Sequence, residues 1–88
     1  MVSSQEINFS TVRVYGKPMC QMCRMTEKWL DSRGVDYDKV DLTQSPDDFA
    51  AVTALGYKVA PVIMVADDVH WGGFRPDLLE LHFGKRAA

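Results

Sequence analysis

Two cysteines, Cys20 and Cys23, are the residues whose type and spacing point most directly to chemistry. Thiols separated by two residues can supply half of a metal site, form a structural bridge, or exchange a disulfide with another molecule. A structural bridge across so short a loop would add little stability, because the stabilisation grows with the length of the loop that is closed. Metal binding and disulfide exchange therefore remain, and the surrounding residues distinguish between them.

A metal site would need further ligands, for which the two histidines, His70 and His82, are the candidates. Structural zinc sites usually take their ligands in closely spaced pairs. His70 and His82 are far apart in the sequence, one on a predicted strand and the other on a predicted helix. We predict no metal at the cysteines. A metal-binding or interaction module with a passive thiol pair is the less favoured alternative.

The residues around the cysteines predict a helix that begins at Cys20. Pro18 disfavours helical backbone at the residue before it, and Met22, Met25 and Trp29 then recur at helical spacing. A side chain at the N-cap accepts hydrogen bonds from the free backbone N–H groups of the first turn, and the positive helix end favours an anion. The sequence therefore places a sulfur where a thiolate is stabilised.

This placement assigns different roles to the two thiols. Cys20 is expected to be the nucleophile, and Lys17 adds a positive charge near it. Cys23 follows one turn later on the same helix face, close enough to bond to Cys20 with little movement, and is expected to be the resolving thiol. The predicted chemistry is reversible exchange of a Cys20–Cys23 disulfide, with no other cofactor.

Hydropathy patterns and turn residues predict the remaining elements. Strands are expected at 11–16, 35–42, 60–66 and 69–71, and helices at about 20–33, 46–55 and 76–83. A crossover helix makes the first two strands parallel neighbours, and a tight turn makes the last two antiparallel. The order β-α-β-α-β-β-α predicts an α/β fold with a four-stranded mixed sheet flanked by three helices. Residues 1–10 are predicted to be a polar leader, and 11–88 a single domain.

The second predicted helix has a clear start signal. Ser45 is a suitable N-cap, and Pro46 stands at the first helical position. Gly56 is expected to end the helix. Its buried face is predicted to consist of Phe49, Val52 and Leu55.

A proline, Pro61, precedes the most apolar predicted strand. A trans proline at the first residue of a strand is the ordinary interpretation, because proline removes one ladder donor. A cis bond would instead make a tight turn that presents the N–H and C=O groups of Ala60 to a bound peptide or thiol compound. The upstream cysteine pair favours the cis interpretation.

Composition and charge restrict the class of protein. The chain has 88 residues and a net charge of −2 with both signs interspersed, so no basic surface predicts nucleic-acid binding. No segment approaches the about 20 apolar residues that a membrane helix needs, and the N-terminus lacks the pattern of a secretory signal. We expect a cytoplasmic monomer with no membrane partner.

Three segments of the sequence resemble the glutaredoxin-like redoxins called NrdH. They are the "KPMCQMC" of residues 17–23, the Ala-Pro-Val of 60–62 and, above all, the "HWGGFRPD" of 70–77. The resemblance implies a thioredoxin-like, glutaredoxin-type fold of three layers. It also implies that thioredoxin reductase, rather than glutathione, reduces the protein, which then passes electrons to a class Ib ribonucleotide reductase.

The resemblance also implies which residues act. Cys20 is the attacking thiol, Cys23 the resolving thiol and Pro61 a cis-proline. The residues expected to contact partners are Lys17, Met22, Ala60, Pro61, Trp71, Gly73, Phe74, Arg75 and Asp77. The ordinary alternatives are core packing for Trp71 and Phe74, and a simple ion pair between Arg75 and Asp77.

Two features depart from the NrdH pattern or suggest another function. Gly72 stands where family members generally have serine, and Gln21-Met22 separate the cysteines where an apolar residue followed by glutamine is usual. The Gly72-Gly73 pair with Asp77 is similar to the residues with which other glutaredoxins hold glutathione. A glutathione-dependent glutaredoxin is therefore the alternative function.

Overall fold

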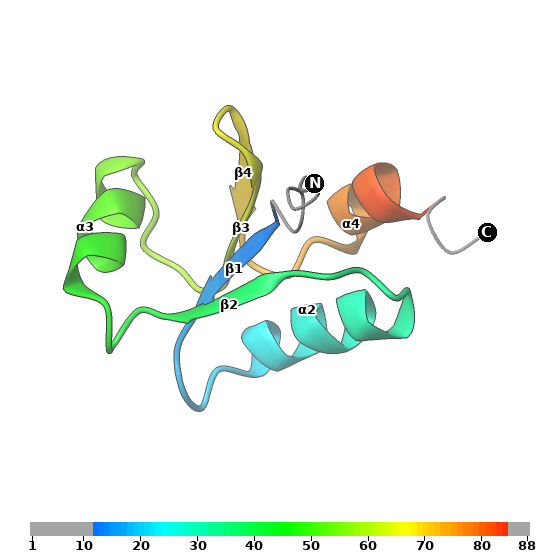
Figure 1. Ribbon diagram of the computed structural model, residues 1–88, viewed down its shortest axis with the longest axis horizontal. Helices are drawn as coiled ribbons and strands as arrows, with labels where there is room; N and C mark the ends of the chain where they lie inside the picture. Colours follow the sequence, from blue (N-terminus) through cyan, green and yellow to red (C-terminus); the bar gives the residue numbers. More distant parts are fainter. Residues whose placement is uncertain (1–11, 85–88) are drawn as a thin grey trace, which may run out of the picture.

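The computed structural model describes residues 12–84 (Figure 1). The elements are β1 (Arg13–Gly16), α2 (Gln21–Ser32), β2 (Asp38–Asp41), α3 (Pro46–Ala54), β3 (Val62–Ala66), β4 (Val69–Gly72) and α4 (Pro76–Phe83). This order confirms the predicted β-α-β-α-β-β-α succession. The predicted leader, residues 1–10, lies outside the described residues.

The four strands form one mixed sheet in the order β2-β1-β3-β4. β1 and β2 are parallel, as expected for strands joined by the crossover helix α2. β3 is antiparallel to both β1 and β4, and the turn between β3 and β4 makes them a hairpin. β1 therefore lies in the interior of the sheet, and its C-terminal end leads directly to the cysteines.

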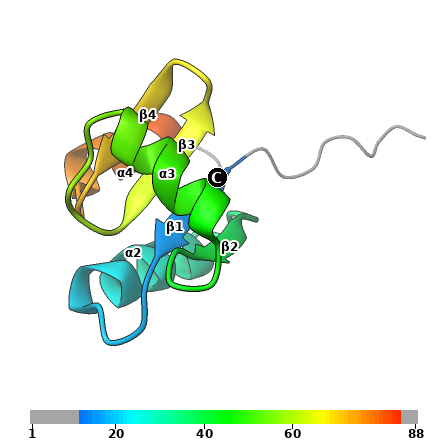
Figure 2. The ribbon, with the colours of Figure 1, turned by 90° about the vertical axis from the view of Figure 1, so that its left-hand side faces the viewer.

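Successive residues of β1 and β3 point to opposite faces of the sheet, and each face is covered by helices. Val14 and Ile63 pack on one face with Leu30 of α2 and Leu79 of α4. Figure 2 shows α3 in front of the sheet and α4 behind it. The fold therefore has three layers, with α2 and α4 on one side and α3 on the other.

The helix α2 begins and ends where the sequence predicts. Cys20 is its N-cap, and Gly34 follows the C-cap with a φ of 69°, a left-handed conformation that glycine adopts without steric cost. Within residues 12–84, every helix is too short or too polar to span a lipid bilayer.

The predicted buried face of α3 is wrong in two of its three residues. Val52 is buried against Tyr15 and Val62, whereas Phe49 is 57% exposed and Leu55 is 47% exposed. Residues three apart on a helix point about 60° away from each other, so Phe49 and Leu55 point about 120° apart with Val52 between them. Only the middle one faces the sheet. Ser45 occupies the N-cap as predicted, but its side chain makes no capping hydrogen bond.

Candidate active site

Cys20 is held at the start of α2 in extended backbone, with its side chain turned back over the first turn. Its Sγ accepts a hydrogen bond from the backbone N–H of Cys23 at 3.2 Å. The two cysteines form a disulfide, with their Cα atoms 5.2 Å apart. A main-chain donor at a helix start favours the thiolate over the thiol, so we expect this hydrogen bond to favour the Cys20 thiolate after reduction.

The two sulfurs have different surroundings. Cys20 is 8% exposed and Cys23 is 3% exposed, so Cys20 is the more accessible of the two. Cys23 packs against the end of β1, where a Cβ added at Gly16 would lie 3.1 Å from its Sγ. The absence of a side chain at Gly16 therefore makes room for the inner sulfur.

The segment before β3 approaches the outer sulfur. The Ala60–Pro61 bond is cis, and the carbonyl oxygen of Ala60 lies 3.8 Å from the Sγ of Cys20. The N–H of Gly73 donates to the carbonyl oxygen of Pro61 at 2.7 Å. Ala60 therefore lies beside the disulfide, and the residue that follows it is hydrogen-bonded to Gly73.

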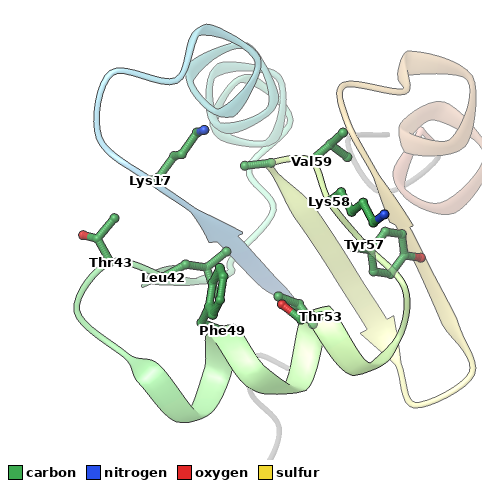
Figure 3. A pocket seen from close by; sticks show the side chains of 10 residues that line it. Lys17, Leu42, Thr43, Phe49, Thr53, Tyr57, Lys58 and Val59 are labelled. Atoms are coloured by element: carbon green, nitrogen blue, oxygen red, sulfur yellow. The ribbon is translucent and has the colours of Figure 1, made fainter.

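A groove of about 460 Å³ extends from Ala60 between α3 and the loops around it (Figure 3). Phe49 and Val59 contribute apolar surface to it, and Lys17 and Lys58 contribute its charges. The described residues that line the groove include no carboxylate, although the chain as a whole is acidic. Phe49, Val52 and Thr53 of α3 form one wall of this groove.

Trp71 occupies the core rather than the surface. It is 5% exposed, belongs to the cluster between the sheet and α4, and stacks on His82 with ring centroids 5.3 Å apart. Phe74 is partly buried against the same cluster. Of the two interpretations of Trp71, core packing describes its position in the fold.

Arg75 and Asp77 form an exposed ion pair at the start of α4. The guanidinium donates two hydrogen bonds to the carboxylate, at 3.1 and 2.9 Å. These bonds lower the pKa of Asp77 and raise the pKa of Arg75. The pair lies beyond Gly73, which has a φ of 83° and redirects the chain from β4 toward α4.

Comparison with known proteins assigns the family. The glutaredoxin family model matches residues 12–71. The glutaredoxin-like protein NrdH of Lactococcus lactis is 37% identical over 68 residues, which are 77% of this chain and 93% of the relative. NrdH of Escherichia coli is 32% identical over 78 residues, 88% of this chain and 95% of the relative. This chain belongs to the NrdH family of glutaredoxin-like proteins.

Solved structures agree with this assignment. The NrdH-redoxin from E. coli superposes with a TM-score of 0.75 at 30% identity, covering 80% of this chain and 91% of that one. A glutaredoxin–glutathione complex from buckwheat gives a TM-score of 0.65 at 26% identity, covering 85% and 71%. The fold is the thioredoxin-like fold in its glutaredoxin form, and the protein is a thiol–disulfide oxidoreductase.

Within this NrdH protein, the sequence-predicted site residues fall into separate groups. Lys17 and Ala60 line the groove, and Ala60 also lies beside the disulfide, joined to Pro61 by the cis bond. Met22 is exposed on the first turn of α2. Trp71 lies in the core.

Eight of the ten residues that line the groove were not predicted as site residues, among them Phe49, Lys58 and Val59. Lys58 and Val59 directly precede Ala60-Pro61, so their place next to the predicted cis bond was the available signal.

Proposed function

We propose that this NrdH protein is a dithiol electron carrier that takes electrons from thioredoxin reductase. It passes them to a disulfide in class Ib ribonucleotide reductase or in another protein of the reducing cytoplasm. The observation that carries the proposal is the hydrogen bond from the Cys23 N–H to the Cys20 sulfur at the helix start, because it favours Cys20 as the attacking thiolate. The E. coli NrdH-redoxin, at 30% identity, is described by its thioredoxin-like activity profile, which supports the choice of reductase.

The reaction proceeds in two exchanges. The Cys20 thiolate attacks one sulfur of the acceptor disulfide, forming a mixed disulfide and releasing the other acceptor sulfur as a thiolate. Cys23 then loses its proton and attacks Cys20, which forms the Cys20–Cys23 disulfide and releases the second acceptor thiol. Two electrons have moved to the acceptor. The reductase returns two electrons by the reverse exchange.

The groove and Ala60 provide a place for the acceptor chain. An extended peptide can pair with the N–H and C=O groups of Ala60, which brings its sulfur toward Cys20, 3.8 Å from that carbonyl oxygen. Phe49 and Val59 offer apolar contact, and Lys17 and Lys58 attract acidic residues. The expected acceptor is therefore an extended, acidic segment next to a disulfide.

A reductase comparison tests the proposal. Oxidised protein and a disulfide substrate are supplied with NADPH and thioredoxin reductase in one series, and with NADPH, glutathione and glutathione reductase in the other. Steady turnover in the first series and none in the second is the expected result. Turnover with glutathione alone would overturn the proposed electron source.

A glutathione-dependent glutaredoxin is the second candidate function. It is favoured by the two lysines of the groove, because glutathione carries two carboxylates, and by the similarity to the buckwheat glutaredoxin–glutathione complex. Titration with oxidised glutathione, followed by nuclear magnetic resonance, measures this directly. Saturable shifts at Lys17 and Lys58 would support the second candidate, and unshifted resonances at millimolar ligand would exclude it.

A further inference from the structure

The segment from Tyr57 to Ala60 must hold its shape if Ala60 is to pair with a substrate. It connects the end of α3 to Pro61, and Lys58 and Val59 within it are exposed (Figure 3). At its start, the N–H of Tyr57 donates to the carbonyl oxygen of Val52 at 3.2 Å. The exposed middle of the segment needs support from another element.

That support comes from β4, through a side-chain contact between Tyr57 and His70. The Tyr57 hydroxyl and His70 Nδ1 are hydrogen-bonded at 2.6 Å. The two rings also meet edge to face, with centroids 5.5 Å apart and planes at 81°. His70 pairs in the β3–β4 hairpin with Met64, so it is anchored in the sheet. The contact therefore ties a loop residue to a fixed strand.

Gly72, two residues further along β4, provides a second contact. A Cβ at this position would lie 2.9 Å from Cγ2 of Val59 and 3.0 Å from Cδ1 of Tyr57. The segment thus packs directly on the backbone of β4, and a side chain at Gly72 would push it away. The hydrogen bond and the glycine act on the same short segment.

We propose that Tyr57, His70 and Gly72 form a clamp that positions Ala60 opposite Cys20 for polypeptide substrates. His70 and Gly72 are positioning residues, since they act through Tyr57 and Val59. A substrate that pairs with Ala60 and lies in the groove depends on the clamp, whereas a small disulfide that needs only the Cys20 sulfur does not. The expected effect on substrate choice rests on the proposed function. The support that the clamp gives to the segment from Tyr57 to Ala60 does not depend on it.

Tyr57→Phe tests the clamp by removing one hydroxyl, and Tyr37→Phe is its matched control. Tyr37 donates a comparable hydrogen bond, to Asp31 at 3.1 Å, but belongs to the connection before β2. With dithiothreitol as reductant, Tyr57→Phe should raise the KM for insulin by about 2- to 10-fold with little change in kcat. The rate at which Tyr57→Phe reduces the small disulfide 5,5′-dithiobis(2-nitrobenzoic acid) should match that of the wild type. An unchanged KM for insulin, or an equal loss with both substrates, would overturn the clamp.

Variants of the other two residues test it independently. Gly72→Ala adds a methyl group against Val59 and should reproduce the rise in KM for insulin. His70→Leu should also raise the KM, whereas His70→Asn, which keeps a polar atom near the place of Nδ1, should restore part of the wild-type value. Equal values for the Leu and Asn variants would contradict the role of the hydrogen bond.

Hydrogen exchange separates the clamp from the proposed function, because it needs no substrate. The amides of Lys58, Val59 and Ala60 should exchange faster in Tyr57→Phe than in Tyr37→Phe. Equal exchange in the two variants would overturn the clamp even in an active protein. Faster exchange in a protein that fails to reduce insulin would keep the clamp and reject the proposed function.

Discussion

We propose different roles for Cys20 and Cys23 because the two sulfurs differ in exposure and in hydrogen bonding. Cys20 lies beside Ala60, which lines the groove, and its Sγ accepts a hydrogen bond from the N–H of Cys23. Cys23 packs against Gly16. We therefore expect an incoming disulfide to react with Cys20 first. Both cysteines and Pro61 could be identified from the sequence, because a short motif carries them.

Cys23→Ser should trap the acceptor at the first exchange. Without a resolving thiol, the mixed disulfide through Cys20 cannot be released, so a covalent complex should accumulate with an acceptor protein under mild conditions. Mass spectrometry without reductant measures its amount. The matched Cys20→Ser variant should trap far less, and equal trapping by both variants would contradict the assignment of roles.

The elements were predicted from the sequence more accurately than the surfaces between them. The order and pairing of strands followed from local patterns, but β2 begins at Asp38 rather than Val35. Val35 is buried in the core without belonging to a strand, so its apolar character reflects packing alone. The groove was not predictable, because it forms where α3 meets the 57–60 segment. The sequence pattern of the helix does not indicate that this segment will pack beside it, and the pattern of the segment does not indicate the helix.

Within α2, Thr26 is buried, and its hydroxyl has no hydrogen-bond partner among residues 12–84. Thr26→Val keeps the shape and removes the unsatisfied group, so it should stabilise the protein by about 1 kcal/mol, or raise Tm by about 4 to 8 °C. Thr26→Ala, which leaves a cavity, should destabilise it instead. Thermal melting measures both variants, and a clear loss of stability in Thr26→Val would show that the hydroxyl has a partner.

For the molecule as a whole, the sheet topology places the end of β1, the start of β3 and the end of β4 together. The cysteines follow β1, Ala60-Pro61 precedes β3 and Gly73 follows β4. The N–H of Gly73 donates to the Pro61 carbonyl oxygen, which links the end of β4 to the start of β3. The residues after Gly73 lead to Arg75. Trp71, near the end of β4, packs in the core between the sheet and α4. We therefore propose that protein partners contact the exposed residues around the disulfide.

Arg75→Ala should separate docking from folding. Arg75 is exposed and pairs only at the surface, so its loss should leave the melting temperature unchanged. If the 70–77 segment docks on thioredoxin reductase, the KM for the reductase should rise about five-fold or more. Lys28→Ala, which removes an exposed cation from α2, is the control. An unchanged KM in Arg75→Ala would remove Arg75 from the docking surface.

The central claim is that the start of α2 holds Cys20 as a thiolate, and the pH dependence of alkylation tests it most directly. Reduced protein is treated with iodoacetamide across a range of pH, and peptide mass spectrometry reports each cysteine separately. We expect rapid alkylation of Cys20 at a pH well below the pKa of a free thiol, which is about 8.5, while Cys23 is still unmodified. Slow alkylation of both cysteines alike, and only in alkali, would contradict it.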